Sequence, residues 1–242
     1  MRRETQHALL LLLGGALARL ALDGTYLRYV RPSHQWPLLG AGLVMVVLAV
    51  VALRRDRSRA AAAHGHAGAA AHGHAGDGGA DRHVPWLLAL PVLAVALVAP
   101  PALGADAVTR AGSGNAVSVG EHLAPLAAGV PELPIAELVQ RAGTGPAGGV
   151  EGREVVLTGF VVRHGAAVDL ARLRIACCAA DARPSRVRLA GDLGLAPPTP
   201  DTWLRVHGVV VAGTATATTG HVPTLAVTLV EVVAPPPDPY EY

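Results

Sequence analysis

The stretch EVVLTGFVV at residues 154–162 decides the fold class of the C-terminal part of this chain. It is rich in β-branched residues and roughly alternating, which is typical of a half-buried β-strand. Four further stretches share the pattern: ARLRI at 171–175, SRVRL at 185–189, WLRVHGVVV at 203–211 and LAVTLVEVV at 225–233. Five short strands in about 80 residues predict a small all-β domain over residues 151–242, with an OB-like barrel favoured and a β-sandwich as the rival.

The segments that flank the strands are rich in turn-forming residues. Residues 213–220, GTATATTG, predict the turn before the last strand. The end of the chain, APPPDPYEY at 234–242, contains too many prolines for a central strand and predicts an extended tail. Before the domain, residues 106–150 predict an irregular connector in which PIAELVQR at 134–141 forms a short helix.

The N-terminal part has a different composition, because almost all long apolar runs lie before Asp106. A bilayer core of ~30 Å needs about 20 helical residues to cross it. We therefore predict a membrane α-helical region over residues 1–105, with three spans at about 8–29, 36–53 and 84–105. A cleaved signal peptide is the alternative for the first span, with Ala16-Leu17-Ala18 as its cleavage site.

The first span reaches a sufficient length only if it includes two charged residues, Arg19 and Asp23. They lie four positions apart, so they share one helix face and could pair. An ionisable pair inside a membrane is a functional hypothesis by default. In the simpler interpretation, both side chains lie near the outer end of the span and extend to the lipid headgroups.

The distribution of arginine predicts the orientation of the spans, since short cytoplasmic loops are enriched in basic residues. Arg2 and Arg3 precede the first span, and an arginine cluster at 54–59 follows the second. We therefore expect a multi-pass protein of the cell membrane, with the N-terminus and the loop at 54–83 in the cytoplasm and everything after residue 105 outside it. The net charge of +2 is too small to suggest nucleic-acid binding.

The predicted cytoplasmic loop contains the sequence HGHAG twice, at 64–68 and 72–76. Imidazole binds transition metals such as Zn, Ni, Co and Cu, and a flexible His-x-His segment can wrap around an ion and become ordered on binding. The candidate ligands of zinc or another transition metal are His64, His66, His72, His74 and His83. The alternative is a low-complexity linker with an accidental duplication.

The chain has two cysteines, and they are adjacent: Cys177 and Cys178 lie in the run RIACCAADARP that begins at Arg174. Successive side chains on a strand point to opposite faces, so the pair can share one side only if the strand ends near Ile175 and turns toward Asp181. Three interpretations stay open. The pair could be thiolate ligands of a metal together with Asp181, a vicinal disulfide in an oxidising compartment, or two small buried apolar residues.

Four further histidines lie in the predicted outer region, and any of them could complete a metal site: His122, His164, His207 and His221. None of them has a spacing that selects it. The sequence has no GxSxG, HExxH or P-loop motif and no GxGxxG after a strand. We therefore do not expect an enzyme.

The run CCAADA at 177–182 resembles the signature of the YcgQ-like family of bacterial two-component membrane permease subunits. Further matches are the GREVVLTGFVV strand, the Arg-x-Arg strand that leads into the motif, the late Pro239-Tyr240, the Pro100-Pro101 pair and the His-rich loop. The resemblance implies a partner, a separate polytopic permease of the YcgR-like type. It implies that the Cys-Cys-Asp motif is important, but it assigns no role to these residues.

Three hypotheses about function follow. The leading one is an accessory subunit of a two-component permease that is linked to transition-metal transport. The second is a membrane-anchored extracytoplasmic module for metal binding or thiol-redox sensing, with Cys177 and Cys178 as the working pair. The third is a membrane-tethered protein-interaction domain. The expected partners are the permease and the lipid bilayer; nucleic acid is not expected, because the outer region lacks an aromatic stacking platform.

Overall fold

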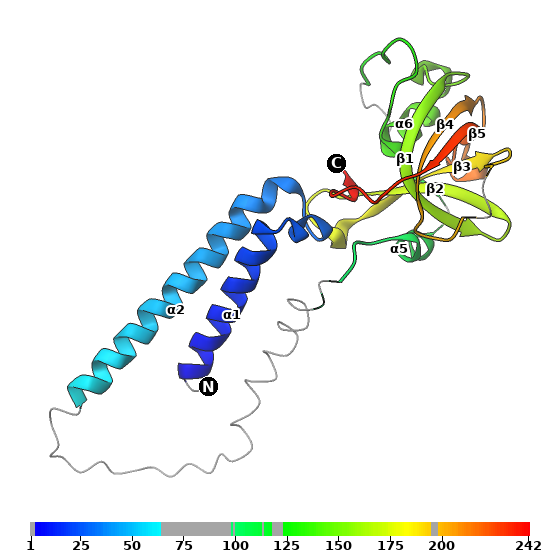
Figure 1. Cartoon of the computed structure of the whole chain (residues 1–242). Coiled ribbons are helices and arrows are strands. Elements are labelled where there is room, and N and C mark those ends of the chain that lie inside the picture. Colours follow the sequence, from blue (N-terminus) through cyan, green and yellow to red (C-terminus); the bar gives the residue numbers. More distant parts are fainter. Residues whose placement is uncertain (1–2, 64–97, 99, 113, 118–122, 195–197) are drawn as a thin grey trace. The chain divides into compact units, whose positions relative to one another are not determined.

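A computed structural model describes residues 3–63, 98, 100–112, 114–117, 123–194 and 198–242 of the chain (Figure 1). The chain divides into two compact units. The helical unit contains residues 1–26 and 32–101, and the β unit contains residues 27–31 and 102–242.

The helical unit contains two described helices, α1 (Arg3–Leu22) and α2 (Gln35–Ala63). Among the described residues, the segment 32–58 is the one helix that is long and apolar enough to cross a membrane, and residues 6–22 form a shorter apolar helix. The second predicted span therefore lies within a helix that can serve as a membrane anchor. The third predicted span, 84–105, lies mostly outside the described residues.

Helix α1 is shorter than the span predicted at 8–29, because it ends at Leu22. The carboxylate of Asp23 accepts a hydrogen bond from the N–H of Thr25 at 2.9 Å, a local turn that competes with the helix. The Nε of Arg19 lies 3.8 Å from the Asp23 carboxylate, and both side chains are exposed. The two charges therefore meet at the end of the apolar helix.

The two helices pack closely through glycine. A Cβ on Gly14 would lie 2.8 Å from the carbonyl oxygen of Gly42, and a Cβ on Gly42 would lie 2.8 Å from that of Gly14. Contacts between small residues of this kind bring membrane helices together. Large apolar side chains stay exposed on both helices, among them Leu12, Leu13, Leu43, Val47 and Leu48. Such a surface suits contact with lipid or with further helices.

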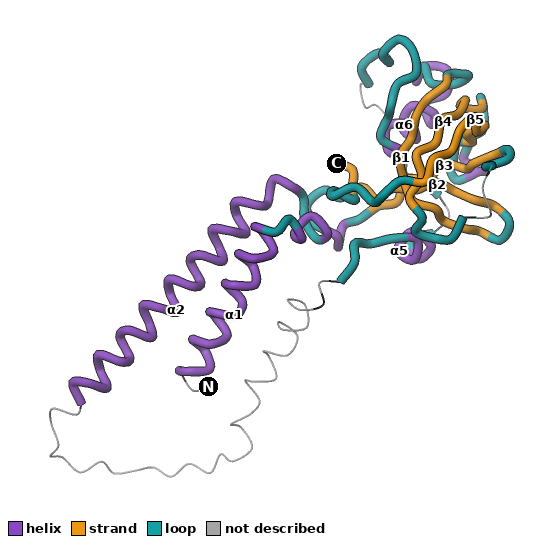
Figure 2. Tube along the Cα trace, viewed as in Figure 1, coloured by secondary structure: helices purple, strands orange, loops and turns teal. Residues whose placement is uncertain are grey.

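The β unit contains one six-stranded sheet, seen as orange strands in Figure 2. Its strands are β1 (Glu154–His164), β2 (Ala167–Arg174), β3 (Arg183–Ala190), β4 (Trp203–Val211), β5 (Thr224–Val232) and β6 (Tyr240–Glu241). The strand order is β1-β4-β5-β3-β2-β6, and β1 also pairs with β2, so the first five strands close on themselves. The pairs β3–β5 and β2–β6 are parallel, whereas the others are antiparallel. The predicted all-β domain is confirmed, and the single closed sheet is not the two-sheet sandwich of the rival prediction.

Two hydrophobic clusters fill the β unit. The first combines inward-facing residues of the barrel strands with the apolar face of α6 (Ile135–Gly143), which corresponds to the helix predicted at 134–141. The second combines Phe160 and Trp203 with α5 (Ala105–Arg110). Helix α5 lies in the stretch predicted to be an irregular connector. It has six residues, too few for an apolar period to be visible in the sequence.

The tail predicted at 234–242 is held in place by contacts of its last residues, which the sequence does not predict. Strand β6 pairs in parallel with the end of β2. The Tyr240 side chain is 3% exposed, and its hydroxyl accepts a hydrogen bond from the Leu103 N–H at 3.1 Å and donates one to the Arg28 carbonyl at 2.8 Å. The Glu241 carboxylate accepts hydrogen bonds from the first two N–H groups of α6, at 2.8 Å each. The prolines restrict the tail to the edge of the sheet. Two of its last residues, Tyr240 and Glu241, bind the backbone of distant segments, including the start of α6.

We expect Tyr240→Phe to lower the melting temperature of the full chain by about 3–5 °C, since it removes a buried hydroxyl with two partners and keeps the ring. Tyr242→Phe removes an exposed hydroxyl that donates to the Asp238 carboxylate at 2.7 Å, and it should shift the melting temperature by less than the Tyr240 variant, because solvent screens this contact. Thermal unfolding of both variants in one detergent, followed by circular dichroism, measures the difference. Equal shifts would show that Tyr240 does not pin the tail.

Candidate functional site

The two cysteines lie in the loop that follows β2. The strand ends at Arg174, and Ile175, which is 1% exposed, anchors the start of the loop in the second hydrophobic cluster. A 3₁₀ turn, η4 (Ala179–Asp181), then leads the chain into β3. Because Cys177 and Cys178 lie in the loop between the end of β2 and this 3₁₀ turn, their side chains are not forced to opposite faces as they would be within a continuous strand.

Asp181 holds this loop together through the backbone. Its carboxylate accepts hydrogen bonds from the N–H groups of Ala176 at 2.8 Å, Cys177 at 2.8 Å and Cys178 at 3.3 Å. A hydrogen bond with the Cys177 thiol, followed by these N–H contacts, holds the pKa of Asp181 well below its usual range. The carboxylate is therefore ionised at physiological pH, and it fixes three consecutive amide groups.

The two thiols lie side by side in the loop. Their sulfur atoms are 3.5 Å apart, and Cys177 is exposed whereas Cys178 is half-buried. A hydrogen bond to Asp181, and then one to Cys178, raises the pKa of Cys177 to about 12. The reduced Cys177 is therefore a neutral thiol at pH 7 and not a reactive thiolate.

A segment from the other end of the sequence supports the cysteine loop. Residues 27–31 belong to the β unit, and Val30 forms an isolated antiparallel bridge with Cys178. The Tyr29 carbonyl and the Arg31 N–H form backbone hydrogen bonds to the same loop at 2.7 and 3.2 Å. The sequence gives no signal for this pairing, because the segment is too short to show strand alternation.

Arg174, the first residue of the predicted motif, lines a groove beside the cysteine loop. The groove has a volume of about 450 Å³, and Arg31, Arg183, Gln140 and Asp181 also line it. The sequence motif contains Arg174 and Asp181 but gives no sign that Arg31, Gln140 or Arg183 would join them, because the groove exists only once α6 and residues 27–31 pack against β2 and β3.

Cys177, Cys178 and Asp181 bring three potential metal-ligand atoms within 4.8 Å of one another, and no histidine of the described residues joins them. His164 instead lies 3.0 Å from the Arg186 guanidinium and 3.7 Å from the Asp169 carboxylate. Arg19 and Asp23 belong to the helical unit. Six predicted ligands lie outside the described residues: His64, His66, His72, His74, His83 and His122.

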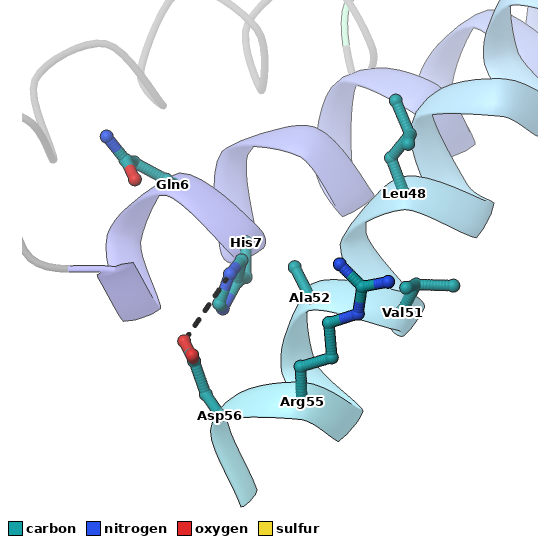
Figure 3. Close-up of a pocket in the computed structure, with 7 residues that line it drawn as sticks. All are labelled: Gln6, His7, Leu48, Val51, Ala52, Arg55 and Asp56. Carbon is teal, nitrogen blue, oxygen red and sulfur yellow. Dashed lines mark ion pairs between the residues drawn. The ribbon is translucent and has the colours of Figure 1, made fainter. Parts of the chain in front are cut away.

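The helical unit has a polar pocket of its own, which the sequence does not signal. Figure 3 shows His7 of α1 directed toward Asp56 of α2, with Nε2 at 3.9 Å from the carboxylate. Gln6 and Arg55 also line this pocket, whose volume is about 340 Å³. A single His–Asp pair between two helices fixes their register and offers too few ligands for a transition metal.

The β unit and its cysteine loop define a small closed-sheet domain that presents two thiols, joined to a chain that carries an apolar helix of membrane-spanning length. Residues 147–242 match the family model of the DUF1980 C-terminal domain. The match includes all six strands and the whole Cys-Cys-Asp loop. No curated protein matches the chain.

The contact between Asp181 and Cys177 gives a testable titration. We expect Asp181→Asn, made in a Cys178→Ser background, to shift the pKa of Cys177 down toward the ordinary thiol value of about 8.5. Alkylation of Cys177 by iodoacetamide at pH 8 should then be at least about ten-fold faster than in Cys178→Ser alone, because the thiolate is the nucleophile.

The pH–rate profile of alkylation, followed by mass spectrometry, measures this shift. Asp192→Asn, which changes an exposed carboxylate outside the loop, is the matched control and should leave the profile unchanged. Identical profiles with and without the Asp181 carboxylate would contradict the assigned contact.

Proposed function

We propose that this chain is an accessory subunit of a two-component membrane permease and that its outer β domain binds a transition-metal ion through Cys177 and Cys178. One observation carries the proposal: two free sulfur atoms lie 3.5 Å apart on an accessible loop, with the Asp181 carboxylate close to both. Two thiolates and a carboxylate form a donor set that suits zinc and similar ions.

The spacing of the sulfur atoms supports metal binding. In a tetrahedral zinc site with Zn–S bonds of ~2.3 Å, two sulfur ligands lie ~3.8 Å apart. The observed separation of 3.5 Å needs only a small adjustment to reach this value. Three ligands from the loop leave a coordination position open, and a water molecule or a ligand from a partner protein can fill it.

Proton release governs the affinity of such a site. Because the hydrogen bond with Asp181 raises the pKa of Cys177 to about 12, a metal ion must displace the thiol proton in order to bind. Affinity therefore rises with pH and falls as the solution becomes acidic. A site with this proton cost releases its ion more readily than a preformed thiolate cluster, which suits transfer to a permease.

The contacts of residues 27–31 support a three-span topology. These residues follow α1 and hydrogen-bond to the β domain, so both lie on the same side of the membrane. If α2 crosses the bilayer, the chain must cross once more before residue 102, and the apolar stretch that begins at residue 84 is the candidate, although Ala105 at its predicted end already belongs to α5 of the β unit. The arginine bias of the sequence favours an N-terminus in the cytoplasm and a β domain outside.

The exposed faces of α1 and α2 support a partner within the membrane. Three helices form too small a bundle for a transport path, which transporters usually build from repeated helix bundles. A polytopic permease of the YcgR-like type is the partner that the family resemblance implies. In this arrangement the helices dock on the permease, and the β domain handles the ion at the outer surface. We assign no enzymatic activity.

Thiol-redox sensing is the second candidate function, and the same sulfur separation favours it. Two reduced thiols at 3.5 Å can be joined by an oxidant into a vicinal disulfide. The two candidates differ in the state that is functional, since metal binding needs both thiols reduced. Thiol counting under air and under reductant distinguishes them.

We expect the reduced full chain in detergent to bind Co²⁺ with a sulfur-to-cobalt charge-transfer band. Cys177→Ala/Cys178→Ala should abolish the band and leave the melting temperature within about 2 °C of the original, because neither thiol is deeply buried. The matched control replaces the loop histidines by Ala: His64, His66, His72 and His74. This variant should keep the charge-transfer band and lose only those cobalt ions that are not bound by sulfur. No band in the unaltered chain would contradict the thiolate site.

The partner is tested by purification of the chain from native membranes in mild detergent. We expect a polytopic membrane protein to co-elute in a fixed ratio and to be identified by mass spectrometry. Gly42→Leu should reduce this ratio, because the added side chain meets the α1 backbone and separates the two helices. Gly40→Leu, at a position with open space, is the control. A chain that elutes alone or as a homo-oligomer would contradict the subunit assignment.

A further inference from the structure

The groove beside the cysteine loop gathers three arginines. Arg31, Arg174 and Arg183 line it together with Gln140, Asp181 and Tyr242. They come from three separate places in the chain: the segment at 27–31, the end of β2 and the start of β3. Its volume of about 450 Å³ is in the range of small-molecule sites.

The arrangement of these arginines costs stability in the absence of a ligand. Arg174 and Arg183 lie directly opposite each other on antiparallel strands, and like charges in that position are destabilising. Within the described part of the chain, neither residue has a carboxylate within ion-pair distance. Arg31 lies over the Tyr242 ring, with the guanidinium carbon 5.1 Å from the ring centre.

The nearby carboxylates are already engaged. Asp181 accepts three backbone N–H groups, and Glu241 accepts two from α6 and faces Arg172 at 3.9 Å. The groove therefore has more arginines than carboxylates, although Glu241 lies opposite Arg174 in the β2–β6 pair and offsets part of its charge. Guanidinium groups bind carboxylates in a bidentate manner, and three of them around one groove match a compact molecule with more than one carboxylate.

We propose that this groove binds a small organic polycarboxylate. Arg174 and Arg183 hold carboxylate groups from the sheet side and Arg31 closes over the ligand from the 27–31 segment. The Gln140 side chain, which donates to the Ala116 carbonyl at 3.0 Å, lines the groove together with Ile175 and Pro184, and the last two supply apolar surface. The site does not depend on the thiols, so it goes beyond the metal-binding proposal, although Ala176 and Asp181 belong to both the groove and the cysteine loop.

Citrate is the probe, titrated by calorimetry into the full chain in nanodiscs of phosphatidylcholine, in buffer stripped of metal by a resin. We expect saturable binding that Arg174→Gln/Arg183→Gln weakens by about one hundred-fold, since each charge-assisted contact contributes about ten-fold. Arg163→Gln, an exposed arginine of β1 outside the groove, should leave the affinity unchanged. The double variant should keep or raise the melting temperature, because it removes the repulsion between opposed arginines.

Lipid phosphate is the other source of anionic groups, and nanodiscs that contain phosphatidylglycerol provide the comparison. Citrate binding in the neutral nanodiscs supports the polycarboxylate site. Its absence there overturns the proposal, whether or not anionic lipid binds. Equal binding of inorganic phosphate also overturns it, because the groove would then select charge alone. Cys177→Ala/Cys178→Ala should bind citrate normally, so a failure of the metal site and a failure of the groove give different results.

Discussion

Strand β1 pairs along both of its edges, and the rest of the β unit depends on this closure. Phe160 lies opposite Ala171 of β2 on one edge and opposite Trp203 of β4 on the other. At the preceding residue, Gly159, a Cβ would lie 2.6 Å from the Ala171 carbonyl oxygen, so a larger residue would push β2 away. The close contact fixes the path of β2, and it thereby fixes the point at which the cysteine loop leaves the sheet.

Two carboxylates organise the region beyond that point through the backbone. The Asp181 carboxylate accepts hydrogen bonds from the backbone N–H groups of the cysteine loop, and the Glu241 carboxylate accepts them from the first N–H groups of α6. Burial raises the pKa of Glu241, and the α6 N–H groups and Arg172 partly oppose this effect. Because both acids bind backbone groups, they leave the thiols and the groove arginines available for ligands. Glu241 therefore has a structural role, whereas Asp181 both supports the cysteine loop and belongs to the proposed metal site.

The sequence predicts those parts of the fold whose burial pattern is local. Strand β4 has the predicted bounds 203–211, since its alternation is uninterrupted, and α6 begins directly after Pro134 as its start signal indicates. The requirement that the strand end near Ile175, stated from alternation alone, is met by β2. These features depend on residues that are close in the sequence. The spacing of apolar residues, every second residue in a strand and every 3.6 residues in a helix, therefore predicts them.

The remaining features depend on contacts between distant segments. The bridge between Val30 and Cys178, the buried Tyr240 and the three-arginine groove each join residues from separate parts of the chain. The spacing of apolar residues does not predict these contacts, because each of the joined segments contributes only one or two residues. The extended tail predicted at 234–242 gives no sign of these contacts for the same reason, since only tertiary packing buries Tyr240.

Proton release separates the two proposed sites electrostatically. A divalent ion that binds Cys177 and Cys178 displaces the thiol protons, so the net charge of the cysteine loop does not change. The positive charge of Arg31, Arg174 and Arg183 therefore does not oppose the bound metal, and a polycarboxylate in the groove neither gains nor loses affinity through that charge. The groove and the thiols are thus expected to bind their ligands independently, although Ala176 and Asp181 belong to both the groove and the cysteine loop.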